Sequence, residues 1–359
     1  MDLFERFPGS NELRTQNFRP EPWRVSPWVA MSALQKAIRR NHKTLALRAA
    51  STLLANDPPR LWRRLLGICF EDVGLGAFDR VQSVVESLSS GAQALRHGQE
   101  WSTATRLIEL LCPATKDRSA DDLLIAASYH PQLAAARLEA KRISNVEKLM
   151  RLEEPGALLS KAIIITDLTP SRWRRRSAPS VASRLIWNAL SNSGSPAKHV
   201  TISMEGYRKT REVLPMMVAL LACSPRSETS LRSPEEVHSM LLPNGLPSYA
   251  FDGFSHEGKA SLSAFLKTET ETARWFRDQV RPSRRGKILS GLVFRVEGSA
   301  VNVRLRHAVA DALRDLADNG FHGDPEIQIA DAATLLRADF ETLNDIRSMV
   351  LTGDLCETV

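Results

Sequence analysis

The sequence predicts a mainly α fold, with a helical array in the N-terminal half and an α+β arrangement with a few short strands in the C-terminal half. Apolar residues recur at helical spacing through the first 150 residues, between short polar loops. Short runs of β-branched residues follow in the middle of the chain. Of the 359 residues, 43% are hydrophobic, which is enough for a sizeable buried core.

Residues 1–27 hold four prolines among polar residues and are expected to form an extended arm anchored by Phe18, Trp23 and Trp28. The helical pattern begins at Ser26, an expected N-cap, with Pro27 as the first helical residue. The Asn-Asp-Pro-Pro stretch at 56–59 should cap a later helix in the same way. Further helices are expected at 44–54, 60–70, 78–88, 100–111, 119–141, 178–191, 206–223, 257–281, 304–319 and 331–350.

Three runs rich in β-branched residues predict strands at 162–166, 199–203 and 292–296. The stretch 224–250, rich in Ser, Pro and Glu, is expected to be a surface loop around a short helix at 234–241. The patterns suggest an arm over 1–27, a helical domain over 28–150, an α+β domain of unknown type over 151–330, and a C-terminal helix with an acidic tail over 331–359.

The charge is unevenly distributed along the chain. From Asp311 to the C-terminus there are eleven acids and three arginines, a net charge of −8. The 45 basic and 30 acidic residues before Asp311 carry +15, and the whole chain carries +7. A basic body favours nucleic acid or another polyanion as a partner. Alternatively, the acidic segment folds back over the basic groups and neutralises them.

Composition also indicates the compartment. No run of about 18 apolar residues is present, and the polar N-terminus has no apolar core of a signal peptide. The four cysteines lie far apart and form no CxxC pair, which fits neither a disulfide scaffold nor a zinc site. We therefore expect a cytoplasmic protein without a membrane partner.

No motif indicates an enzyme or a cofactor. GxxxxGK[ST] and GxSxG are absent, and the eight histidines form no HxH or HExxH pattern, so we expect no metal and no catalytic residue. Asp252, His256 and Lys259 could still converge at a loop-to-helix junction. In the alternative interpretation, Ser255 caps the helix that begins at Glu257 and Asp252 satisfies a turn.

Arginine-rich clusters are the main candidates for a functional surface. Guanidinium groups pair with phosphate, and an indole among them stacks on an unpaired base. The alternative is a solvated face whose arginines pair with the protein's own acids. The residues expected to contact nucleic acid are Arg172, Trp173, Arg174, Arg175 and Arg176, then Arg281, Arg284, Arg285 and Lys287 in a loop before a strand, and Arg39 and Arg40 with Arg60, Arg63 and Arg64 as neighbours.

Residues 28–130 also carry a series of motifs: SALQKAIRR at 32–40, ALR at 46–48, WRRLLGICF at 62–70 and EDVGL at 71–75. This series resembles the C-terminal helical region of replication-associated recombination protein A. That family consists of clamp-loader-like AAA+ ATPases and includes the Werner-helicase-interacting proteins. The Glu-Asp-Val-Gly motif after the double arginine is the most specific part, although Phe70 replaces the small residue usual before it.

In that family the region forms part of the collar through which subunits assemble. The resemblance implies a collar-like domain over 28–150, with Arg63, Arg64, Glu71 and Asp72 in assembly. The family's ATPase module would precede these helices, where this sequence has 27 residues, and no Walker motif occurs. A homo-oligomer and a separate AAA+ ATPase or replication protein are therefore the implied partners. In the plain structural alternative, the two acids pair with the preceding helix or cap the next one.

Three functions follow from these observations. The first is a non-enzymatic, DNA-associated assembly protein of replication, recombination or repair, with single-stranded DNA as one candidate ligand. The second is a protein–protein scaffold or adaptor that binds no nucleic acid. The third is a metal-dependent enzyme acting on DNA or nucleotides around Asp252, His256 and Lys259.

Overall fold

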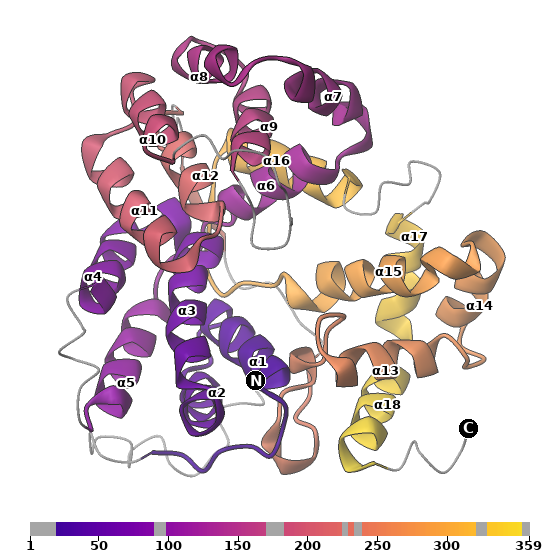
Figure 1. The fold of residues 1–359 in the computed structure, drawn as a ribbon. Coiled ribbons are helices and arrows are strands. Elements are labelled where there is room, and N and C mark those ends of the chain that lie inside the picture. Colours follow the sequence, from indigo (N-terminus) through magenta and orange to yellow (C-terminus); the bar gives the residue numbers. More distant parts are fainter. Residues whose placement is uncertain are drawn as a thin grey trace.

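The computed structural model describes residues 19–89, 98–169, 183–224, 229–232, 239–320 and 329–353. Within these ranges the protein is mainly helical and has two short strands in its C-terminal half, so the predicted fold class is confirmed. Figure 1 shows α1–α5 on one side, α6–α12 with α16 beside them, and the remaining C-terminal helices together on the opposite side. No described helix is both long and apolar enough to cross a membrane.

The first group of helices agrees closely with the sequence patterns. Ser26 is the N-cap of α1 and accepts a hydrogen bond from the Val29 N–H, and Asp57 caps α3 by accepting from the Arg60 N–H. A π-helical turn at Cys69–Val73 and a 3-10 turn at Gly74–Ala77 follow α3. The helices are α1 (Pro27–Arg39), α2 (Lys43–Asn56), α3 (Pro58–Ile68), α4 (Phe78–Ser89) and α5 (Glu100–Leu111).

In the second group α12 is buried along its whole length and packs against α6, α9, α10 and α11. His130 and Pro131 interrupt the helix expected over 119–141. Arg211, in the left-handed conformation, separates the two helices that replace the one expected over 206–223. The helices are α6 (Ser119–Tyr129), α7 (Ala134–Arg142), α8 (Asn145–Glu153), α9 (Leu158–Leu168), α10 (Ser183–Asn192), α11 (Ala197–Thr210), α12 (Leu214–Leu221) and α16 (Ala308–Gly320).

The third group forms the C-terminal side of the molecule. The single helices expected over 257–281 and 331–350 are each divided in two. The basic segment 281–287, expected to be a loop, is instead the start of a helix, because Pro282 occupies its first position. The helices are α13 (His256–Phe265), α14 (Glu271–Gln279), α15 (Pro282–Val293), α17 (Ile329–Ala338) and α18 (Phe340–Thr352).

All three predicted strands are wrong. The β-branched runs at 162–166, 199–203 and 292–296 lie in α9, in α11 and at the junction of α15 with a π-helical turn. The run in α9 is apolar because α6, α7, α8 and α12 all pack against that helix. A helix enclosed on several sides loses the one-sided periodicity that distinguishes it from a buried strand, and packing overrides β-propensity.

The actual strands are three residues long and join distant parts of the chain. β1 (Ser230–Arg232) pairs antiparallel with β2 (Arg304–Arg306), with Leu231 opposite Leu305. Lys116 extends the pairing, because its N–H donates to Val303 and its carbonyl accepts from Leu305. Neither strand lies in a predicted strand, since three residues are too few to show an alternating pattern.

The buried core does not divide near residue 150, where the sequence suggested a domain boundary. A first core collects apolar side chains from Trp23 to Phe251, and Leu313 of α16 joins it. A second core runs from Leu262 to Ile346. The break between the two cores therefore lies between Phe251 and Leu262.

Phe70 also has a structural explanation. It is fully buried in the π-helical turn after α3 and packs on α11, where a Cβ atom at Gly206 would lie 2.3 Å from the phenyl ring. The bulky residue before the Glu-Asp pair is therefore accommodated by a glycine 136 positions later in the chain. Any side chain at Gly206 would force α3 and α11 apart.

Candidate nucleic-acid interface

Asp72 lies at the centre of a buried network of charges. Its Oδ1 accepts hydrogen bonds from Arg39 Nε at 2.7 Å and from Arg118, and its Oδ2 accepts from Gln35 at 2.8 Å. Burial alone would raise the pKa of this carboxyl, but the two guanidinium groups lower it below its usual range. The network ties α1 and the start of α6 to the turn after α3.

Arg39 and Arg40, predicted to contact nucleic acid, are enclosed by protein and only 1% and 7% exposed. Arg39 also donates to the carbonyl of Gly298, and Arg40 donates to the carbonyl of Glu297. Burial lowers the pKa of Arg40 to about 10. The prediction for this pair is therefore corrected: the C-terminal part of the chain covers them, so a phosphate cannot reach them in this structure.

The four residues predicted for assembly lie in different environments. Asp72 is buried, whereas Arg63 is exposed. Glu71 lies 3.8 Å from Arg64 and 3.5 Å from Arg39, measured between nitrogen and carboxylate oxygen. Glu71 thus pairs with an arginine of the preceding helix, as in the plain structural alternative, whereas Asp72 pairs with Arg39 of α1 and with Arg118 and has no surface to offer a partner.

The cluster around Asp252 does not form the convergent site considered above. Its Oδ2 accepts from Lys36 Nζ at 2.8 Å, so the carboxylate balances a buried lysine of α1. Ser255 caps α13, and its side chain accepts the backbone N–H three residues further on. His256 and Lys259 are exposed on α13. This geometry matches the alternative interpretation of a capping serine and a structural aspartate.

The basic cluster at the start of α15 is only partly available. Arg281 and Lys287 are exposed, whereas Arg284 and Arg285 are half-buried. The Arg285 guanidinium donates to the carbonyl of Val280 at 2.8 Å and to two other carbonyls at the end of α14. It therefore caps the C-terminus of that helix. The remaining cluster, Arg172, Trp173, Arg174, Arg175 and Arg176, lies outside the described residues.

The structure brings together an aromatic–arginine surface that the sequence analysis did not select as a site. Trp28, in the first turn of α1, is 43% exposed. The guanidinium carbon of Arg60 lies 5.0 Å from the centroid of its ring, and Arg60 also pairs with Asp57 at 2.8 Å. Arg63, one turn further along α3, is exposed. The cation–π contact keeps the indole in place while leaving part of it accessible.

A second exposed aromatic belongs to the same region. Ser32, one turn after Trp28 on α1, donates to Asp252 at 2.7 Å, and Phe254 follows two residues later with 73% of its surface exposed. We call Trp28, Arg60, Arg63 and Phe254 the Trp28 surface. Its basic part could be expected from the sequence, but the exposure of Trp28 could not, because the sequence suggested that this tryptophan anchors the arm.

Comparisons with known proteins identify no relative of this chain. No protein-family model matches it, and neither a curated protein nor a solved structure does. The resemblance to replication-associated recombination protein A therefore stays a prediction.

Proposed function

We propose that this protein is a DNA-associated assembly protein of replication, recombination or repair that binds single-stranded DNA through the Trp28 surface. The observation that supports the proposal is the exposed Trp28 ring with Arg60 against it. An exposed indole stacks on an unpaired base whatever its sequence, and neighbouring arginines neutralise the backbone. This combination is typical of sequence-independent single-strand binding.

The charge that remains on the surface is consistent with this proposal. Arg39, Arg40 and Arg118 are buried and bind groups of the protein itself. Arg63 is exposed beside the Trp28–Arg60 pair. Additional phosphate contacts are proposed for Arg281 and Lys287 on α15, and for the arginines at 172–176. Such contacts make the affinity depend on salt rather than on base sequence.

Fluorescence anisotropy with a labelled single-stranded oligonucleotide and the matching duplex tests the proposal across a salt series. We expect tighter binding to the single strand and an affinity that falls steadily as salt increases. Trp28→Ala should weaken binding roughly 5- to 100-fold, the range for losing one stacked base. Arg151→Gln is the matched control, because this arginine is exposed on α8, far from α1 (Figure 1).

Two outcomes would contradict the proposal. One is the absence of single-strand binding even at low salt. The other is an affinity of the Trp28→Ala variant equal to that of the Arg151→Gln variant, which would place the DNA contact elsewhere on the molecule.

A scaffold without nucleic-acid binding is the second candidate, and a specific surface favours it. Val146 and Met150 stand one turn apart on α8 and are 68% and 56% exposed. Leu138 of the preceding helix is also exposed. A second copy of the chain is the proposed partner. Light scattering after size exclusion should show an oligomer that the double variant Val146→Glu, Met150→Glu converts to monomer; a monomeric parent protein would rule this out.

A further inference from the structure

A short turn joins the first core to α13 and presents an exposed aromatic ring. Phe251 belongs to the first core and Leu262 of α13 to the second, and Phe254 lies between them with 73% of its surface exposed. Its ring is packed in neither core, so it gains nothing from the burial that stabilises its neighbours.

Asp252 ties this turn to α1. Its Oδ1 accepts the backbone N–H of Phe254 at 2.9 Å. Its Oδ2 accepts hydrogen bonds from Ser32 at 2.7 Å and from Lys36 at 2.8 Å, both on α1. One buried carboxylate therefore holds the backbone of Phe254 and the face of α1 together.

Two glycines fix the same turn from other sides. A Cβ atom at Gly253 would lie 1.9 Å from Ser290 Oγ of α15, so a side chain there would collide with that helix. A Cβ atom at Gly258 would lie 1.8 Å from the carbonyl oxygen of Asp252. The turn is thus packed closely against α15 and against the start of α13, and the ring of Phe254 projects from a fixed backbone.

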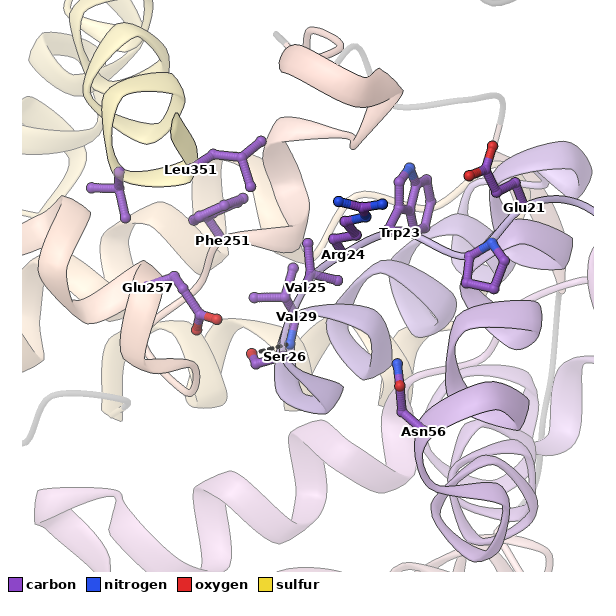
Figure 2. A pocket seen from close by; sticks show the side chains of 12 residues that line it. Glu21, Trp23, Arg24, Val25, Ser26, Val29, Asn56, Phe251, Glu257 and Leu351 are labelled. Atoms are coloured by element: carbon purple, nitrogen blue, oxygen red, sulfur yellow. Dashed lines mark hydrogen bonds between the residues drawn. The ribbon is translucent and has the colours of Figure 1, made fainter. Parts of the chain in front are cut away.

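The turn adjoins the part of α1 that carries Trp28. Trp28 lies one turn before Ser32 on the same face of α1, about 5.4 Å along the helix axis. Figure 2 shows Phe251 and Glu257, which flank the turn, across a cavity from the start of α1. One helical turn, one hydrogen bond and two residues of chain therefore separate Trp28 from Phe254, a path that a strand of several nucleotides can span.

Lys259 supplies a positive charge on the side of this ring. Ser255 is the N-cap of α13, so Phe254 is the residue before the cap and Lys259 is the fourth residue of the helix. In capped helices these two positions commonly pack together as an apolar pair. Here the second position holds an exposed lysine that forms no ion pair in the described part of the chain. The two residues repeat the combination of an exposed ring and a cation seen at Trp28 and Arg60.

We propose that Phe254 and Lys259 form a second nucleotide-binding position of the Trp28 surface, in which the phenyl ring stacks on a base and the ammonium group binds the adjoining phosphate. Asp252 and Gly253 are positioning residues, because they hold the ring beside α1 without contacting DNA. A single strand offers a base and a phosphate at every nucleotide, which matches two such ring-and-cation positions in succession. The inference rests on the proposed function and extends it, since one bound strand then contacts both cores.

Fluorescence anisotropy with a labelled oligothymidylate of about 15 nucleotides tests the second position. Phe254→Ala should weaken binding roughly 5- to 100-fold, the range for losing one stacked base. Lys259→Gln should make the slope of log affinity against log salt shallower by about 0.7, the value for one phosphate contact on a single strand. Tyr129→Ala is the matched control, because this aromatic residue is 61% exposed at the end of α6, and it should bind like the parent protein.

A second-site rescue tests the positioning role. Gly253→Ala should displace the turn and weaken binding roughly threefold or more, although both rings and all cations remain. Ser290→Gly removes the atoms that the new methyl group meets, so adding it to Gly253→Ala should restore the affinity. In the Phe254→Ala background, Gly253→Ala should have no further effect on affinity, a result that a merely structural loss would not give. Thermal melts check that each variant is folded at the assay temperature.

The outcomes separate this inference from the proposed function. If the parent protein binds no single strand, both are overturned. If Trp28→Ala weakens binding but Phe254→Ala binds like Tyr129→Ala, only the second position is overturned, and the phenyl ring is left for a protein partner. The positioning role is overturned if the loss in Gly253→Ala persists without the Phe254 ring, or if Ser290→Gly does not relieve it.

Discussion

Two arginine pairs on neighbouring helices differ in their exposure to solvent. Arg39 and Arg40 end α1, while Arg60 and Arg63 lie on α3, and both pairs interrupt apolar patterns in the same way. The first pair is buried, whereas Arg63 is exposed and Arg60 lies against an exposed tryptophan. A basic helix face therefore does not by itself indicate a nucleic-acid surface, because it can equally meet acids and carbonyls of the same chain.

The difference arises from what covers each helix. Lys36, Arg39 and Arg40 of α1 contact Asp252, Gly298 and Glu297, which come from the C-terminal part of the chain. Arg347 of α18 joins them by donating to Glu297 at 2.9 Å. We call these seven residues the polar seam, since they lie where the two cores meet. Within the described residues no C-terminal segment covers the arginines of α3 in this way; Arg63 is exposed, and Arg60 and Arg64 are partly exposed.

Asp72→Asn should have the largest effect, because it removes the charge that balances two buried guanidinium groups. We expect a loss of about 3–5 kcal/mol in the free energy of unfolding. Urea denaturation followed by circular dichroism measures it. Glu71→Gln is the control and should cost less than about 1 kcal/mol, since Glu71 is partly exposed and makes longer contacts. Equal losses in the two variants would contradict a central role for Asp72.

Glu297→Gln tests how much the polar seam contributes to stability. The carboxylate is almost fully buried and accepts from Arg347 and Ser248, so the neutral side chain leaves Arg347 without its counter-charge. We expect a loss of about 2–3 kcal/mol in the free energy of unfolding, by the same measurement. Hydrogen exchange should show the largest loss of protection in α18 and at the end of α1. Uniform loss throughout the chain would argue against a local seam.

The pH dependence of stability tests whether the acids beside Arg118 resist ionisation. Burial raises the pKa of Asp121 to about 7 and of Asp122 to about 6, although Arg118 opposes both shifts. The folded protein then retains protons that the unfolded chain releases near pH 4, so the contribution of these acids is complete below about pH 4 and is lost as the pH rises through 6 and 7. The pKa of Asp72 is lowered, and its opposite contribution changes only below about pH 4.

We therefore expect the free energy of unfolding to fall by on the order of 4 kcal/mol between pH 5 and pH 7.5. Urea denaturation at intervals of half a pH unit gives the slope. Asp122→Asn should reduce that slope, because its side chain cannot titrate. A stability that rises over this range would show that the ion pairs with Arg118 outweigh burial.

The smallest effect on stability is expected at the exposed pair. Arg60→Gln with Arg63→Gln should change the free energy of unfolding by less than about 0.5 kcal/mol apart from the cap contact of Arg60 with Asp57. In the anisotropy assay, however, the slope of log affinity against log salt should become shallower by about 1.4, the value for two phosphate contacts on a single strand. An unchanged slope would remove these arginines from the interface.

Local patterns predicted much of the helical structure. The caps at Ser26 and Asp57 are where the sequence placed them, and α5 has the predicted bounds. These features depend on residues a few positions apart, whose steric and hydrogen-bonding preferences act within one turn. The run in α9 failed as a strand prediction because a fully enclosed helix and a buried strand have the same apolar composition.

The candidate site was harder to predict, for a related reason. The sequence placed the basic residues Arg39, Arg60 and Arg63 on the polar faces of predicted helices. It could not show which of these faces another segment of the chain covers. Trp28 was expected to be an anchor, and its exposure follows from the way α1 meets α3.

The sequence by itself determined the mainly helical fold and, to within two residues, the starts of α1–α6, because caps, prolines and apolar spacing act locally. It also determined that a basic body precedes an acidic C-terminal segment. Tertiary structure alone decided which charges reach solvent. The contacts that bury Arg39 and Arg40 join residues more than 200 positions apart, and no local pattern records a partner at that distance.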